Sequence, residues 1–372
     1  MSRIIRLIVP GLVIQAVMVG GGYATGRELV EFFISAGPAT ALAGMTITAI
    51  FFSITAAISF ELARRFRAFD YRSFCRIYLG RFWLLFELGY FAGLLLSLSV
   101  VSAAAASLLA ESVGSPYLLN TLLFMGAVAG LVFFGNSVIE RVISAWAIIF
   151  YLAYGTMFAL VLARLGENLG TALAAVPLAA GEAFTSALSY TGYNIVLIPI
   201  MIFVARNLRS GREALIAGAL AGPLILLPGI AFLLTLSAFY PAILTETLPV
   251  SAVLGFIGMP WLSLVIGTVI LGALVKTGAG LLHGLNERVV NAAEERGRAL
   301  PAIWRSGIAL TAMAVAAFAA SAFGLIDLIR YGFRYSSFYF LLVFLLPLFT
   351  RGVWLLWRRA DILASDARST AS

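Results

Sequence analysis

Residues 19–33 read VGGGYATGRELVEFF and lie in the middle of the first hydrophobic segment of the chain. Glycines occupy positions 20–22 and recur at Gly26. Each glycine inside a helix costs about 1 kcal/mol relative to alanine, so the stretch predicts an interrupted membrane span. We expect one helix to end near Val19 and a second to begin near Thr25. Open backbone at membrane depth is tolerated only where protein or a water-filled cavity satisfies it.

The composition is that of a polytopic membrane protein. Of the 372 residues, 62% are hydrophobic and 11% are charged, whereas soluble domains carry about 25% charged residues. The long apolar runs predict an all-α protein with about ten transmembrane helices in one domain that spans residues 1–372. The basic residues separate apolar runs and are not interleaved with aromatic residues, so we expect a lipid bilayer and no nucleic acid as partner. Cys75 is the one cysteine, so no internal disulfide can form.

Arginine-rich segments alternate with loops that carry few arginines. By the positive-inside rule these segments lie in the cytoplasm, so we expect both termini and a tail of residues 351–372 on the inner side of a bacterial cytoplasmic membrane. We also expect an interfacial helix in residues 69–81, a loop at 164–182 and a short helix over the outer face in 241–258. The arginine-rich segments are residues 3–6, 64–81, 206–212, 288–305 and 351–359.

A second interruption is predicted in the sixth span, where residues 189–194 read SYTGYN. Breaks in spans one and six occupy corresponding positions if the chain is an inverted repeat of five plus five spans, about residues 5–164 and 182–350. Paired breaks of this kind build the substrate site of secondary transporters. Taken singly, a flexible kink or ordinary helix packing explains each break; the pairing favours a site. The predicted substrate-binding residues are Gly20, Gly21, Gly22, Tyr23, Ala24, Thr25, Gly26, Tyr190, Thr191, Gly192, Tyr193 and Asn194.

These features resemble a known fold and, more narrowly, a known family. Ten spans with breaks in the first and sixth resemble the LeuT-type fold of the amino acid–polyamine–organocation superfamily. The stretch VGGGYATGRELVEFF is similar to the signature G-x-G-[FY]-A-[ST]-G-x-E-x-x-x-FF of the YkvI-type membrane proteins. The resemblance implies alternating access around a central site between spans one, three, six and eight, with an amino acid or related amine as substrate. Half-helix N-termini near Thr25 and Asn194 would present N–H groups that suit a carboxylate.

Lys276 lies midway along the predicted eighth span, in ILGALVKTGAGLLHGLNER. A lysine at the centre of a membrane helix costs about 2.5–3.5 kcal/mol and marks a functional residue by default, although a snorkelling side chain is the alternative. The resemblance places Lys276 and Thr277 where sodium-coupled members bind sodium. An ammonium that replaces the ion and exchanges its proton would make transport proton-linked and sodium-independent; a permanent structural cation is the competing interpretation. His283 is either a proton relay or a structural histidine.

Charged residues begin the second half of the first span. Thr25 and Glu28 have the T-x-x-E spacing of a capping box, so a cap alone explains Glu28, and Glu31 is explained by solvation in an outer vestibule. The resemblance implies that Arg27 closes an outer gate against an acidic residue at the start of span ten, and Asp327 occupies that position.

The sequence thus favours a secondary transporter of a small solute, linked to protons. The alternative is a non-transporting membrane protein on the same fold, which senses a ligand or assists assembly. No selectivity motif of a channel is present. No P-loop, CxxC, HExxH or nucleophile elbow is present either, so we expect neither an enzyme nor a cofactor or metal site.

Overall fold

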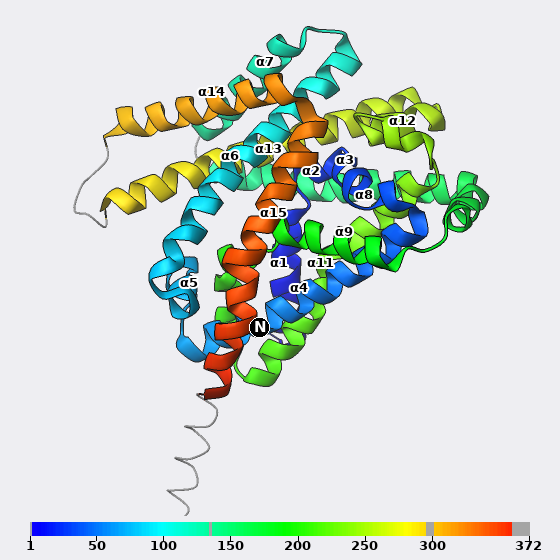
Figure 1. Ribbon diagram of the computed structural model, residues 1–372. Coiled ribbons are helices and arrows are strands. Elements are labelled where there is room, and N and C mark those ends of the chain that lie inside the picture. Colours follow the sequence, from blue (N-terminus) through cyan, green and yellow to red (C-terminus); the bar gives the residue numbers. More distant parts are fainter. Residues whose placement is uncertain (1, 134–135, 295–300, 359–372) are drawn as a thin grey trace, which may run out of the picture.

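The computed structural model describes residues 2–133, 136–294 and 301–358, and all regular elements among them are helices (Figure 1). Six helical stretches of this part are long and apolar enough to cross a bilayer. The chain is therefore an all-α polytopic membrane protein, as its composition predicts. Residues 359–372 of the predicted tail lie outside the described residues.

The first five spans follow the predicted order. The interrupted first span is followed by a long second helix, a short helix where the interfacial helix was predicted, and three further spans. In chain order the elements are α1 (Arg3–Met18), α2 (Gly21–Ala24), α3 (Arg27–Phe32), η1 (Ile34–Ala36), α4 (Pro38–Phe66), α5 (Tyr71–Leu79), η2 (Gly80–Phe82), α6 (Trp83–Val113), α7 (Tyr117–Phe133) and α8 (Asn136–Ala175).

The second half begins with another interrupted span and has a short helix, α12, between its seventh-span and eighth-span helices, as predicted. Gly324 has a left-handed backbone (φ 72°), which separates the ninth span from the tenth. The elements are α9 (Ala180–Asn194), α10 (Leu197–Ile200), η3 (Ile202–Asn207), α11 (Gly211–Ser237), η4 (Ala242–Thr245), α12 (Pro249–Ile257), α13 (Pro260–Glu294), α14 (Ala302–Asp327), η5 (Leu328–Phe333), α15 (Arg334–Phe340), η6 (Leu341–Leu345) and η7 (Leu348–Gly352).

The predicted loop at residues 164–182 is largely wrong. Helix α8 bends at Leu165 (φ −129°) but continues to Ala175. It ends just before Val176, which precedes Pro177, and a residue before proline is driven out of the helical region. The connection to α9 is therefore only a few residues long.

Two prolines tie α11 to its neighbours. Proline has no N–H, so the carbonyl four residues before it loses its helical partner. Before Pro228 this is the carbonyl of Leu224, which accepts a hydrogen bond from Gln15 Nε2 of α1. The second freed carbonyl, that of Ala219, accepts a hydrogen bond from Ser53 Oγ of α4 at 2.9 Å. Helix α11 is thereby fixed against both α1 and α4.

Small residues let α4 and α11 approach each other at backbone distance. A Cβ at Gly222 would lie 1.9 Å from the carbonyl oxygen of Ala49, and a Cβ at Gly218 would lie 2.3 Å from the backbone of Ala57. Glycines spaced by four residues are typical of such interfaces in membranes. The contact is therefore possible only while both positions lack a side chain.

The helices form two groups (Figure 1). Helices α1, α4, α9 and α11 pack on one another, whereas α6, α7, α13 and α14 pack on one another. The interrupted first span lies between the groups, because α2 contacts α6 and α13 while α3 contacts α9 and α11. A movement of one group against the other would therefore act on the break.

Candidate functional site

The first break lies where the glycines predict it. Helix α1 ends at Met18, the single turn of α2 follows, and α3 begins at Arg27. The predicted capping box is wrong: Gly26, with a left-handed backbone (φ 79°), occupies the N-cap position of α3. The hydroxyl of Thr25 accepts a hydrogen bond from the N–H of Arg27 at 3.3 Å instead. Glu28 is thus released from a capping role.

Protein groups satisfy the backbone on the α3 side of this break. The carbonyl of Ala24 accepts a hydrogen bond from the Tyr154 hydroxyl of α8, and the carbonyl of Thr25 accepts one from the N–H of Val250 in α12 at 3.2 Å. A Cβ at Gly26 would lie 2.9 Å from Leu236. The carbonyl groups before α3 are therefore satisfied by protein, and the carboxylate site at its N-terminus stays a prediction.

The second break differs from the prediction in its position and polarity. The residues that read SYTGYN are helical and form the end of α9, and the interruption follows at residues 195–196. Helix carbonyls rather than N–H groups are unpaired at such an end. The helix end at Asn194 therefore carries partial negative charge, and the N–H groups that the sequence predicted there lie at the start of α10, at Leu197.

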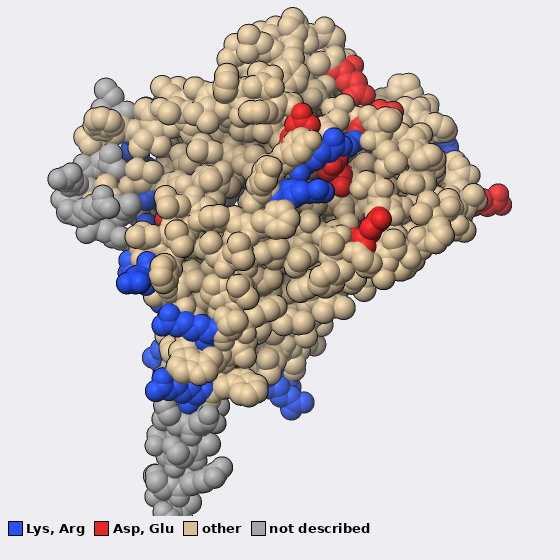
Figure 2. Space-filling model, viewed as in Figure 1, with Lys and Arg blue, Asp and Glu red and all other residues tan. Residues whose placement is uncertain are grey.

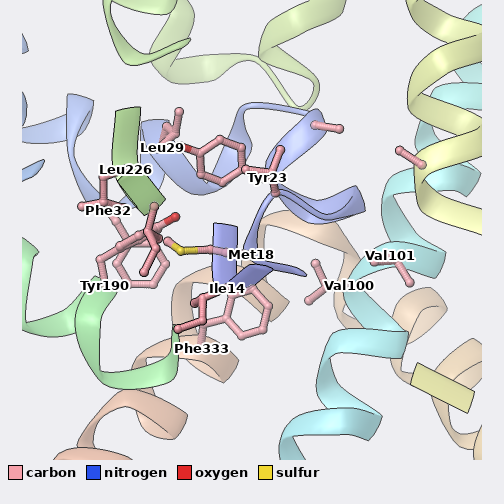
Figure 3. Packing of buried hydrophobic residues seen from close by; sticks show 14 of the residues in the cluster. Ile14, Met18, Tyr23, Leu29, Phe32, Val100, Val101, Tyr190, Leu226 and Phe333 are labelled. Atoms are coloured by element: carbon pink, nitrogen blue, oxygen red, sulfur yellow. The ribbon is translucent and has the colours of Figure 1, made fainter. Parts of the chain in front are cut away.

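The two interrupted spans meet at a hydrogen bond between their side chains. The Tyr193 hydroxyl of α9 donates to Glu28 Oε2 of α3 at 2.6 Å. The Tyr193 ring stacks on Phe333, with a centroid distance of 4.4 Å, and on Phe32 at 5.3 Å. Tyr190 packs edge-on against Phe32 at 5.7 Å, in the cluster shown in Figure 3. Both ring faces of Tyr193 are thus covered, which fixes its hydroxyl on Glu28.

Tyr23 is the third tyrosine of the predicted site, and its position depends on a glycine. Its side chain is 4% exposed, and a Cβ at Gly229 of α11 would lie 1.7 Å from its hydroxyl oxygen. Tyr190 is completely buried, and its ring packs against Phe32 and Phe33 of the first span. Figure 3 shows Tyr23 and Tyr190 on either side of Met18, at the end of α1.

Other predicted substrate residues have structural neighbours. A Cβ at Gly20 would lie 3.3 Å from Thr277 Oγ1, so the first break rests on the middle of α13, as the resemblance implies. A Cβ at Gly192 would lie 2.7 Å from the backbone oxygen of Ser337, so α9 and α15 touch there. Thr191 is completely buried. Gly21 and Gly22 lie in α2.

The candidates for ion or proton coupling follow one another along α13. Thr277 donates a hydrogen bond to the carbonyl of Ala273 at 2.8 Å. Lys276 is half-buried beside it and forms no ion pair with a residue that the structure describes. His283 lies about two turns further along and is also half-buried.

The predicted gate pair Arg27–Asp327 is wrong. Arg27 pairs with Glu31 at 2.8 Å, and Glu31 also binds Arg330 at 2.6 Å, so the vestibule carboxylate is the shared partner of two arginines. Asp327 is exposed and forms no ion pair within the described parts of the chain. The reason is its position at the end of α14: the wide turn of η5 directs Arg330, three residues later, toward α3.

Arg27 is also held by the connection between α11 and α12. Its Nη1 donates to the carbonyl oxygens of Leu244 at 3.0 Å and Glu246 at 2.8 Å. Helix α3, η4 and η5 are thereby joined at one end of the molecule. We name Arg27, Glu31 and Arg330 the outer ion-pair network, after the side on which the resemblance predicts the gate.

Glu28 is the functional candidate that the sequence analysis passed over. Four acidic residues of the described chain are buried, and three of these have an arginine: Glu61, Glu87 and Glu213. Glu28 is hydrogen-bonded to Tyr193 instead. The sequence contains a sign of this. Arg27 and Glu31 have the i, i+4 spacing of an ion pair, so the arginine nearest to Glu28 is expected to pair with Glu31 instead.

Comparisons with known proteins identify the fold. No model of a known protein family and no curated protein sequence matches the chain. Its structure is similar to that of a mutant of the Eremococcus coleocola manganese transporter, with a TM-score of 0.55 and 14% identity over 91% of this chain and 77% of that one. The chain has a LeuT-type transporter fold. It is also similar to a Na⁺-coupled sialic acid symporter in its substrate-bound outward-open state, with a TM-score of 0.51 and 14% identity over 91% and 84% of the two chains.

Proposed function

We propose that this protein is a secondary transporter that moves a small amino acid or related amine across the cytoplasmic membrane by alternating access. The observation that carries the proposal is the contact between the two interrupted spans, where Tyr193 binds Glu28. Interrupted helices at membrane depth are the parts from which transporters build a central site. The break lies between two packed groups of helices, which supports rocking of one group against the other. The inverted repeat of residues 5–164 and 182–350 belongs to this proposal.

The charge distribution supports cytoplasmic termini. In Figure 1 the N-terminus and the last described helix lie toward the same end of the molecule. In the view of Figure 2 basic side chains gather at that end, and acidic side chains gather toward the opposite end. Positive charge marks the cytoplasmic side of membrane proteins. The outer ion-pair network then lies on the external side, where it closes the path above the break.

We further propose proton coupling through Lys276, without sodium. The break rests against α13 at Thr277, and Lys276 is the adjacent residue. The carbonyl end of α1 carries partial negative charge, which would favour an ammonium in this region. A lysine that alternately binds and releases a proton would couple solute movement to the proton gradient.

The experiment is solute uptake into liposomes that contain the purified protein. We expect uptake of an amine or amino acid that is driven by an inward proton gradient and unchanged when sodium is replaced by choline. Lys276→Met should abolish its pH dependence, whereas Lys276→Arg separates a proton carrier from a permanent cation because arginine keeps its proton. If Lys276→Met leaves uptake as pH-dependent as before, the coupling role is wrong. Binding of solute without net flux would favour the sensor over the transporter.

A further inference from the structure

Glu28 has a different environment from every other buried carboxylate of the described chain. It is 7% exposed, as buried as Glu213 at 7% and close to Glu61 at 4%. Each of those two has an arginine nitrogen within 2.9 Å. A buried charge is strongly unfavourable unless it is paired and hydrogen-bonded. Glu28 therefore lacks the arginine partner that the other buried glutamates have.

The charged groups closest to Glu28 along the chain are already engaged. Arg27 and Arg330 both bind Glu31, and Arg27 also holds two backbone carbonyls. The elements packed on α3 include α9, η5 and α11, and the residues they direct at this region are aromatic or apolar: Tyr193, Phe333 and Leu236. No resident cation of the described chain neutralises Glu28.

The remaining polar groups around the two breaks also favour positive charge. Helices α1 and α9 end at Met18 and Asn194, each with its carbonyl end toward a break. Helix C-termini carry about half a negative elementary charge. The Tyr193 hydroxyl already donates its hydrogen to Glu28, and its oxygen can still accept a hydrogen bond. These carboxylate, carbonyl and hydroxyl oxygens can all accept hydrogen bonds, so they suit a ligand group that carries several donor hydrogens.

We infer that Glu28 binds the ammonium group of the transported solute. This assignment rests on the proposed transporter function and deepens it, because it names the residue and the charged group of the substrate. An ammonium brings three donors and supplies the missing positive charge. A transition-metal ion is the less suitable ligand, because such ions use several carboxylate, imidazole or thiolate ligands. In the part of the chain that the structure describes, no three such side chains converge.

The test uses three probes of equal size and different charge on the purified full-length protein. Thermal unfolding is followed with propylammonium, 1-propanol and propionate, each over a concentration series. Propylammonium should raise the melting temperature with a saturable dependence, since a ligand that binds only the folded state stabilises it. The neutral and anionic probes should have little effect. This comparison needs no variant, so it stands even where a substitution disturbs folding.

Two variants and one matched control assign the binding to Glu28. Glu28→Gln keeps the shape and should weaken propylammonium binding about 10- to 100-fold, which corresponds to the loss of a charged hydrogen bond. Tyr193→Phe keeps the stacked ring and should weaken binding by a smaller factor, about 3- to 10-fold. Glu182→Gln changes an exposed carboxylate at the other end of α9 and should leave the affinity within about twofold of wild type.

Several results would overturn the inference. The assignment is wrong if propylammonium stabilises the protein no more than 1-propanol, or if Glu28→Gln keeps the wild-type affinity. It is also wrong if propylammonium gives no Glu28-dependent stabilisation while manganese chloride, or acidification alone, does. The liposome assay distinguishes this failure from failure of the transporter proposal. If Glu28→Gln still transports the solute at the wild-type rate, only the role of Glu28 is refuted. If the solute binds in a Glu28-dependent way but no flux occurs, only the transporter proposal is refuted.

Discussion

In the proposed orientation, substitution of Glu31 by glutamine should open the external side of the protein. Glu31 is the one carboxylate shared by Arg27 of α3 and Arg330 of η5. Glutamine has almost the same shape but no charge, so both ion pairs are lost while the packing is retained. The closed arrangement would then be held mainly by the bonds from Arg27 to the carbonyls of Leu244 and Glu246.

The size of the effect follows from the burial of the two pairs. The side chains of Arg27 and Glu31 are 4% and 10% exposed, and breaking a buried pair by removing one partner costs about 3–5 kcal/mol. The retained carbonyl bonds favour the lower value, about 3 kcal/mol, which is on the order of a 100-fold change in the population of the open state. Arg330 is 42% exposed, so Arg330→Ala should cost about 1 kcal/mol or less, at most about fivefold.

The assay is the labelling rate of a cysteine placed beneath the network. Phe232 is 5% exposed and packs against Gly26, so Phe232→Cys reports access to the break from outside. The native Cys75 is completely buried and gives the unlabelled control. With a membrane-impermeant thiol reagent on whole cells, labelling should accelerate strongly in Glu31→Gln and weakly in Arg330→Ala. Equal rates in the two variants, or no acceleration in either, would refute the reasoning.

Two further substitutions test how α11 is fixed, both by thermal unfolding of the purified protein. Gly229→Ala places a Cβ 1.7 Å from the Tyr23 hydroxyl oxygen and should destabilise the protein by about 1–3 kcal/mol; Gly255→Ala meets no described atom within 4 Å and is the control. Equal melting temperatures for these two variants would mean that Tyr23 moves without cost. Gln15→Leu leaves the carbonyl of Leu224 unpaired and should cost about 1–3 kcal/mol; an unchanged melting temperature would contradict this role of the side chain.

The sequence predicts the first break well because its cause is local. Glycine clusters weaken a helix wherever it lies, and the first break occurs at the predicted place. The details at Gly26 were not predictable in the same way. Its left-handed backbone makes it the N-cap, and the contacts of Leu236 and Val250 that cover it come from distant parts of the chain. The T-x-x-E pattern at Thr25 therefore forms no capping box, and Thr25 binds the N–H of Arg27 instead.

The partners of the charged residues were less predictable. The i, i+4 pair of Arg27 with Glu31 follows from helix geometry alone, and a local argument would have found it. The partner from the tenth span depends on which residue of that span faces α3. The π-helical turn of η5 decides this in favour of Arg330 over Asp327, and no pattern in the sequence predicts such a turn.

The position of the second break changes what kind of ligand the site favours. An interruption before Asn194 would have begun a new helix there, and N–H groups would have favoured a carboxylate. Because α9 extends through Asn194, carbonyl groups lie at that helix end, and N–H groups follow only at the start of α10, at Leu197. Glu28 adds a carboxyl group without an arginine partner on the neighbouring span. A solute that enters with its ammonium first would meet complementary charge, whereas one that enters with a carboxylate would meet repulsion. On this reasoning a simple amine without a carboxylate should bind, and an acid without an amine should not.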